Sequence, residues 1–116
     1  MQGMLFEGNS VNNMPRNTTS SVFFYYVYVL ESARDGKRYI GYTANLRRRI
    51  EEHYKGRSLA TKPRLPFKFV YFEGCLNQQD AKRRENYLKT TQGMRFLGIR
   101  LAQYKRQIKT AFGSGS

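Results

Sequence analysis

The feature that most constrains the fold is an unbroken run of aromatic and aliphatic residues, VFFYYVYVL, at Val22–Leu30. A strand with one face in water alternates apolar and polar side chains, and this run has no polar face. It therefore predicts a central strand that is buried on both sides. Asp35-Gly36, a strong signal for a two-residue hairpin turn, comes next, and the stretch RYIGY at 38–42 predicts a second, antiparallel strand.

A helix is predicted after this hairpin. The segment from about Ala44 to Lys55 reads NLRRRIEEHYK after its first residue, and Thr43 or Asn45 is suited to cap it. Gly56 is suited to end it, because glycine readily adopts the left-handed conformation that closes many helices.

The second half of the chain predicts one further strand and two helical stretches. A loop with two prolines at 57–66 leads to the strand FKFVYFE at 67–73, which Gly74 is expected to end. Asn77 is expected to cap a helix over 78–90. A third helical stretch has one apolar face, made up of Met94, Leu97, Leu101 and Tyr104. The order β-β-α-β-α-α indicates an α+β fold with a small three-stranded antiparallel sheet flanked by helices.

The length of 116 residues suits one domain with a real core. Residues 1–21 are rich in Asn, Ser, Thr and Gly and are expected to form a flexible N-terminal tail. The domain is expected to span 22–109. Residues 110–116, which end in Gly-Ser-Gly-Ser, are expected to form a flexible C-terminal tail.

The net charge of +13 arises from 21 Lys and Arg against 8 Asp and Glu, and it is concentrated in 34–109, which hold twenty of the bases and six of the acids. This density favours a polyphosphate partner, since each neutralised phosphate releases counterions. An anionic membrane is the competing partner. Nucleic acid is favoured because no expected helix pairs a broad apolar face with a wholly basic one.

Composition also bears on the compartment and on metals. With no long apolar run and no secretory signal pattern, we expect a cytoplasmic protein that does not bind a membrane, with association with the nucleoid as an option. The only cysteine is Cys75 and the only histidine is His53, so a Cys/His zinc site within one chain is not expected.

The predicted hairpin brings two tyrosines together. A two-residue turn at Asp35-Gly36 sets Tyr28 opposite Thr43, so that Tyr28, Tyr39 and Gly41 share one face of the sheet. Gly41 would then remove a side chain between two hydroxyl-bearing rings and leave room for a ligand beside them. A register slip of one residue would reverse this result, and tyrosines in apolar strands are more often core residues.

The first predicted helix directs an unusual pair of side chains inward. Its apolar stripe is Leu46, Arg49, Ile50 and His53. A buried-facing arginine must pair with an acid or bind an external anion, and phosphate is the anion that this charge balance favours. The histidine alone is weaker support, because a lone histidine in such a stripe is more often a hydrogen-bonded core residue.

The second predicted helix places an acid in its apolar stripe, since Glu85 lies between Ala81 and Leu88 at helical spacing. The simpler interpretation is an ion pair with an arginine such as Arg49. The alternative is a Mg²⁺ site, because Mg²⁺ commonly uses one or two carboxylates and takes its other ligands from water and substrate phosphates.

Together these residues resemble a known family. Val27-Tyr28-Val29, then Tyr39-Ile40-Gly41, and then Arg49, His53 and Glu85 resemble the GIY-YIG nuclease family over about Tyr25–Tyr104. The likeness is greatest to the short, single-domain bacterial branch, related to the N-terminal nuclease domain of the excision-repair incision subunit. The resemblance implies a three-stranded antiparallel sheet with helices and a divalent-metal-dependent phosphodiester hydrolase.

The resemblance also assigns roles. It implies Tyr28 and Tyr39 as the paired active-site tyrosines, Arg49 as the phosphate-binding arginine, His53 as an assisting polar group and Glu85 as the ligand of Mg²⁺, or of Mn²⁺ in its place. A tyrosine base needs its usual pKa of about 10 lowered by the metal and the arginine, or a proton relay through the histidine. Tyr28 is favoured as the base, and the opposite assignment stays open.

We therefore expect a DNA endonuclease of repair or recombination with low sequence specificity, acting on duplex or branched DNA, as a monomer rather than a homodimer. The residues expected to grip backbone phosphates are Arg47, Arg48, Lys55, Arg57, Lys62, Arg64 and Lys89. One alternative is a non-catalytic nucleic-acid-binding module on the same fold. Another is a basic domain that docks on an acidic protein partner.

Overall fold

The computed structural model describes residues 23–111, and the chain divides into two compact units after Glu85, within a helix. The N-terminal tail predicted for 1–21 lies outside the described residues, as do residues 112–116 of the predicted C-terminal tail. Thr110 and Ala111 belong to the last helix.

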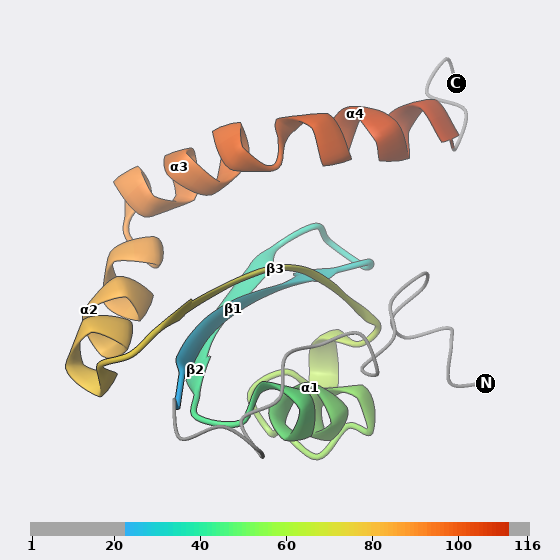
Figure 1. Cartoon of the computed structure of the whole chain (residues 1–116). Coiled ribbons are helices and arrows are strands. Elements are labelled where there is room, and N and C mark those ends of the chain that lie inside the picture. Colours follow the sequence, from blue (N-terminus) through green and yellow to red (C-terminus); the bar gives the residue numbers. More distant parts are fainter. Residues whose placement is uncertain (1–22, 112–116) are drawn as a thin grey trace. The chain divides into compact units, whose positions relative to one another are not determined.

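The first unit is built on a three-stranded antiparallel sheet (Figure 1). Strand β1 (Tyr25–Ser32) lies between β2 (Arg38–Thr43) and β3 (Phe67–Cys75). From Tyr26 to Leu30 every β1 side chain is buried, so both of its faces are covered. The prediction of a central strand is confirmed, because a run without a polar face is stable only where both faces are hidden from water.

The β1–β2 hairpin has a longer loop than predicted. Ser32 and Lys37 close it, and the Gly36 N–H donates to the Ser32 carbonyl at 2.8 Å. Gly36 has a φ of +73°, a conformation that glycine adopts without strain. Tyr28 is consequently opposite Gly41 rather than Thr43, so the predicted register was wrong by two residues. A shift of two leaves each side chain on its face, which is why the shared face of the tyrosines was still predicted correctly.

Strand β3 also departs from its prediction, since it continues past Gly74 to Cys75. Its register with β1 shifts between Val29, opposite Tyr71, and Leu30, opposite Phe69. The extra residue is a β-bulge, which brings the side chains that follow it onto the other face. As a result Phe72 lies opposite Tyr28, on the same face of the sheet.

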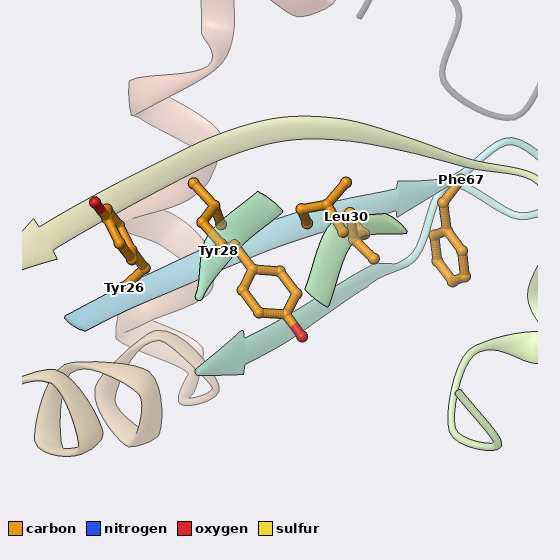
Figure 2. Packing of buried hydrophobic residues seen from close by; sticks show 6 residues of the cluster. Tyr26, Tyr28, Leu30 and Phe67 are labelled. Atoms are coloured by element: carbon orange, nitrogen blue, oxygen red, sulfur yellow. The ribbon is translucent and has the colours of Figure 1, made fainter. Parts of the chain in front are cut away.

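Helix α1 (Leu46–Tyr54) covers that face of the sheet (Figure 1). Asn45 is its cap, accepting from the Arg48 N–H at 3.2 Å, and Thr43 Oγ1 supports the cap by accepting from the Asn45 N–H at 3.0 Å. Gly56, with a φ of +73°, follows the helix, as predicted. The core between helix and sheet is made up of Leu46 and Ile50 against Tyr26, Tyr28, Leu30 and Phe67 (Figure 2).

The loop after α1 contains a short 3₁₀ helix, η3 (Lys62–Arg64), and reaches β3 through a cis peptide bond at Leu65-Pro66. Helix α2 (Gln78–Leu88) then begins after Asn77, whose side chain accepts from the Asp80 N–H at 3.1 Å, as predicted. This part of α2 contacts the opposite face of the sheet from α1, because Arg84 bonds Glu73.

The second unit holds the end of α2 and two further helices. The sequence predicts one helical stretch here, whereas the structure has α3 (Thr91–Arg100) and α4 (Ala102–Ala111) with Leu101 between them. Thr90 caps α3 by accepting from the Gly93 N–H at 3.1 Å. Among residues 23–111, no helix is long and apolar enough to cross a membrane.

Candidate active site

Tyr28 stands at the centre of the predicted site. Its side chain extends from β1 beneath α1 and is 1% exposed. Its hydroxyl oxygen is 2.7 Å from His53 Nε2 in a hydrogen bond, and its ring centroid is 6.3 Å from that of Tyr39 on β2. The two tyrosines and the histidine, which the sequence predicts as partners, are therefore in mutual contact.

Gly41 serves a different purpose from the one predicted. A Cβ on Gly41 would overlap Cζ and Oη of Tyr28, which lies directly across from it in the sheet. The space left by the missing side chain is filled by the Tyr28 ring, so the prediction that it holds a ligand was wrong. Gly41 instead allows this tyrosine to lie flat over the neighbouring strand.

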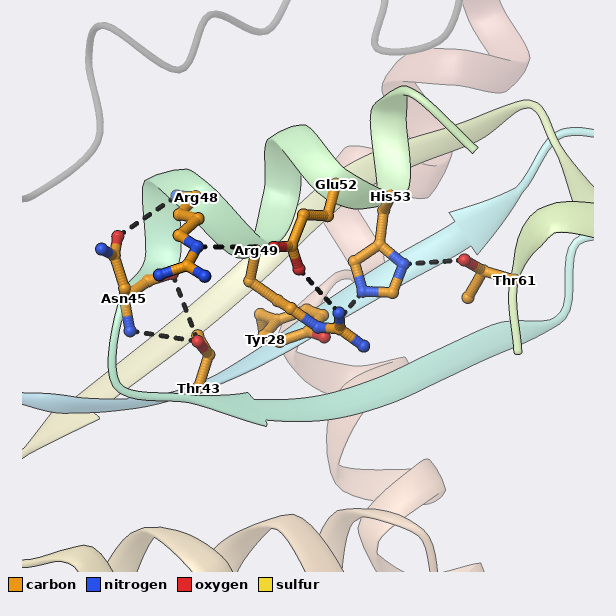
Figure 3. A network of polar contacts seen from close by, with 8 residues as sticks. All are labelled: Tyr28, Thr43, Asn45, Arg48, Arg49, Glu52, His53 and Thr61. Carbon is orange, nitrogen blue, oxygen red and sulfur yellow. Dashed lines mark hydrogen bonds and ion pairs between the residues drawn. The ribbon is translucent and has the colours of Figure 1, made fainter. Parts of the chain in front are cut away.

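His53 is fully buried and makes a second hydrogen bond, with 2.7 Å between Nδ1 and Thr61 Oγ1 (Figure 3). Burial, together with the nearby Arg49 charge, lowers the pKa of His53 to about 4. The imidazole is consequently neutral near pH 7. A neutral ring can donate from one nitrogen and accept at the other, but it cannot serve as a charged acid.

Arg49 is the inward arginine of α1, and its side chain is 33% exposed. Its Nη1 donates to Glu52 Oε1 at 2.8 Å, so its acidic partner is Glu52 rather than Glu85. Burial opposes the guanidinium charge, but hydrogen bonds with Glu52 and Tyr28 hold the pKa of Arg49 above its ordinary value. Arg49 thus presents a permanent positive charge beside the Tyr28 hydroxyl (Figure 3).

The Tyr28 phenol is held in its neutral form. Burial raises its pKa above the ordinary value, and the charges of Tyr39 and Glu85 act in the same direction, whereas the hydrogen bond from Arg49 acts against them. Hydrogen-bond donors to the phenolic oxygen would therefore lower this pKa and favour the phenolate form.

Glu85 lies half-buried on α2, within electrostatic range of Tyr28. In the described part of the chain there is no group of three or more His, Cys, Asp or Glu side chains that could hold a metal by themselves. A single carboxylate fits Mg²⁺ or Mn²⁺ only where water and substrate oxygens complete the coordination. The chain thus suits an ion that binds together with a phosphate.

The predicted phosphate-binding residues differ in exposure. Most of them are exposed, namely Arg48, Lys55, Arg57, Lys62 and Lys89. Arg47 and Arg64 are half-buried, and Lys89 belongs to the second unit.

Sequence reasoning missed two contacts of this network. Glu52 bridges Arg48 and Arg49, with N···O distances of 3.4 Å and 2.8 Å. The i,i+4 spacing predicts the ion pair with Arg48, whereas the one with Arg49 was missed. Thr61 lies in an irregular loop eight residues after His53, and no periodicity links the two positions.

Comparisons with known proteins found a family model, several relatives and a solved structure that are similar to this chain. A family model of the GIY-YIG catalytic domain matches residues 24–95. The chain is 45% identical over 65 residues to a UPF0213 protein of Streptococcus pneumoniae, a match that covers 55% of this chain and 65% of that protein. It is 34% identical over 84 residues to UPF0213 protein OB0043 of Oceanobacillus iheyensis, covering 72% of this chain and 94% of that protein.

The match therefore spans just under two thirds of the length of the Streptococcus relative. A solution NMR structure, of the UPF0213 protein BH0048 from Bacillus halodurans, is similar at 30% identity, with a TM-score of 0.47. That similarity covers 74% of this chain and 95% of the Bacillus chain.

Proposed function

Because the chain belongs to the GIY-YIG catalytic-domain family, a family of nucleases, we propose that it is a divalent-metal-dependent endonuclease that hydrolyses DNA phosphodiester bonds. The observation that supports this most is the buried Tyr28 hydroxyl, which meets both the His53 ring and the Arg49 guanidinium. A core tyrosine needs one hydrogen-bond partner, and an arginine held beside it by Glu52 adds a fixed charge. This combination suits a reaction that develops negative charge.

Arg49 is the phosphate-binding group in this proposal. Its side chain is one-third exposed, so an incoming phosphate can reach it, and Glu52 fixes its position in advance. A guanidinium pre-positioned in this way stabilises the charge that builds up on the phosphate oxygens in the transition state. Glu85 would hold the divalent ion, which when bound supplies further charge neutralisation at the phosphate.

Tyr28 is proposed as the general base and Tyr39 as the group that positions the attacking water. In its phenolate form Tyr28 accepts a proton from water as the water oxygen bonds to phosphorus. The bond from phosphorus to the leaving deoxyribose oxygen breaks, and that oxygen takes a proton from solvent. Since burial raises the pKa of Tyr28, cleavage should speed up toward alkaline pH.

The exposed cations support DNA as the substrate. Such side chains contact backbone phosphates, which carry no sequence information, so we propose low sequence preference. We also propose that a single domain spanning 22–109 acts as a monomer in the cytoplasm, in repair or recombination, on duplex or branched DNA.

The test is incubation of the protein with supercoiled plasmid, linear duplex and branched DNA, with and without Mg²⁺ or Mn²⁺. We expect metal-dependent nicking that is lost in Tyr28→Phe and in Glu85→Ala. Asp80→Ala is a matched control, since it removes an exposed acid from the same helix. If the parent protein binds all three DNAs in a salt-dependent manner but cleaves none, the non-catalytic binding module is the better description. If Glu85→Ala cleaves as well as the parent, Glu85 is not the metal ligand.

A further inference from the structure

His53 forms two short hydrogen bonds with only one ring hydrogen. Its Nε2 is 2.7 Å from the Tyr28 hydroxyl and its Nδ1 is 2.7 Å from the Thr61 hydroxyl. Because the ring is neutral, one nitrogen donates and the other accepts. In either tautomer one hydroxyl hydrogen, that of Tyr28 or that of Thr61, has no acceptor within the hydrogen-bonded chain Tyr28–His53–Thr61. The two tautomers differ in which end of the chain carries that hydrogen.

At the Thr61 end the extra hydrogen has nowhere to go. Thr61 is 0% exposed, and within residues 23–111 its Oγ1 has a single hydrogen-bond partner, His53 Nδ1. A hydrogen on Nδ1 would occupy that contact and leave the buried hydroxyl hydrogen unsatisfied. A buried hydroxyl hydrogen without an acceptor biases the ring against that tautomer by roughly fivefold to hundredfold.

At the Tyr28 end the extra hydrogen is carried by an oxygen beside Arg49, the proposed phosphate-binding residue. The Tyr28 oxygen lies beside Arg49, which is partly open to solvent, and beside the half-buried Tyr39. Because Tyr28 itself is 1% exposed, the acceptor there would be a water molecule or a phosphate oxygen held by the partly exposed Arg49. The leftover hydrogen is thus tolerated at the substrate side of the chain.

We propose that Thr61 is a positioning residue that donates its hydroxyl hydrogen to His53 Nδ1 and thereby fixes the ring as the Nε2–H tautomer, aimed at the Tyr28 oxygen. The catalytic consequence rests on the proposed nuclease function. His53 is then a donor to Tyr28 and cannot take its proton, which excludes the relay through His53. Instead, His53 donates to the Tyr28 oxygen and the Arg49 charge lies near it, an arrangement that stabilises a phenolate.

The tautomer can be measured directly, without DNA or metal, because His53 is the only histidine in the chain. Long-range ¹H–¹⁵N correlation spectra of the ¹⁵N-labelled protein near neutral pH report which ring nitrogen carries the hydrogen. We expect a protonated Nε2 and an unprotonated Nδ1 in the wild type. A protonated Nδ1 in the wild type would overturn the inference by itself, without any variant.

Two substitutions of similar size separate the hydroxyl from the packing. Thr61→Ser keeps the donor and should keep the Nε2–H signature. Thr61→Val removes the donor and should give a mixture of both tautomers. A pure Nε2–H signature in a folded Thr61→Val protein would show that another group fixes the ring, and would overturn the role of Thr61.

The pH dependence of cleavage gives the catalytic readout. Thr61→Val should raise the apparent pKa of the alkaline rise in rate by about one unit, and so lower the rate about tenfold at pH values below that rise. Thr61→Ser should follow the wild type. The two proposals fail separately: an Nε2–H signature in a protein that never cleaves DNA rejects the nuclease, whereas cleavage by a protein with the Nδ1–H tautomer rejects only the role of Thr61.

Discussion

The sheet unit and the C-terminal helical unit have nearly the same net charge, but only the sheet unit contains acidic side chains. The described residues 23–85 hold fourteen Lys and Arg and seven acids, a net charge of +7, and 86–111 hold six Lys and Arg and no acid, a net charge of +6. In the sheet unit acids hold cations in place, as in Arg49–Glu52, Arg84–Glu73 and Arg38–Glu31. The second unit contains no Asp or Glu of its own.

This difference separates two uses of positive charge. A guanidinium with a fixed direction can stabilise charge at one point of a reaction, and that requires a partner holding it in place. Cations without acidic partners attract any polyanion at a distance and lose that attraction in salt. We therefore expect substitutions in the sheet unit to change the chemistry, and substitutions in the second unit to change only the affinity.

The largest effect is expected for Arg49→Ala, compared with Arg48→Ala. Both arginines lie on α1 and both contact Glu52, but the Arg48 side chain is 75% exposed and the Arg49 side chain 33%. Loss of a pre-positioned charge should lower kcat by about 100-fold to 1000-fold. Arg48→Ala should change kcat by less than about threefold, since exposed ion pairs contribute little. Plasmid nicking at saturating DNA measures kcat for both variants. Equal losses of kcat would show that the fixed position of Arg49 gives it no special role.

Two glycine substitutions test how closely side chains pack around one position in each unit. A Cβ at Gly41 overlaps the buried Tyr28 ring, whereas a Cβ at Gly98 in α3 meets nothing within 4 Å. Gly41→Ala should destabilise the fold by about 3 kcal/mol, the upper range for overpacking. Gly98→Ala should stabilise it by up to about 1 kcal/mol, because alanine favours helix. Urea unfolding followed by circular dichroism measures both, and a neutral Gly41→Ala would mean that Tyr28 can leave its position at little cost.

Acid should destabilise the protein through His53. The unfolded state gains a proton on His53 near its usual pKa of 6.5, whereas burial lowers the folded-state pKa to about 4. The contribution of neutral His53 to the free energy of unfolding is therefore fully present above about pH 6.5. It decreases as the pH falls toward 4, by about 2 kcal/mol at about pH 5. Thermal unfolding at about pH 7 and about pH 5 measures this.

His53→Gln is the control for this acid effect, and it should show a smaller pH dependence between the two values. Residues 86–111 contain no His, Asp or Glu and cannot produce the effect. An unchanged midpoint of the parent protein would mean that His53 is not held neutral by burial.

The sheet was largely predictable because its signals are local. Each signal determines the structure of residues close to it in the sequence. The signals are the apolar run of β1, Gly41 after Ile40 in β2, and the capping residue Asn45. The hairpin loop was not predictable, because Asp35-Gly36 is compatible with both a two-residue turn and the longer loop that the structure has. The β3 bulge was hidden for a similar reason, since FKFVYFE reads as regular alternation and only pairing with β1 shows the extra residue.

The residues of the site likewise fall into some that local sequence patterns predict and some that they do not. Tyr28, Arg49 and His53 were predictable because strand and helix periodicity directs them to one face. Thr61 was not, because the loop that brings it to His53 has no period and is held by the Ser58 carbonyl, which accepts from the Thr61 N–H at 3.2 Å. The simpler interpretation paired Glu85 with an arginine such as Arg49, but the acid that accepts from Arg49 is Glu52, one turn along α1.

The smallest effect is expected from the cations of the second unit. Replacing Arg95, Arg100 and Arg106 together by Gln should weaken DNA binding about tenfold and lower the slope of log affinity against log salt by about 0.9 for each phosphate that is no longer neutralised. Cleavage at saturating DNA should not change, since these exposed residues have no acidic partner in their unit to orient them. A triple replacement of exposed Gln92, Gln103 and Gln107 by Ala on the same helices is the matched control. If the arginine variant instead loses cleavage at saturating DNA with its salt slope unchanged, the helical unit takes part in the chemistry, and charge without acidic partners is not limited to attraction.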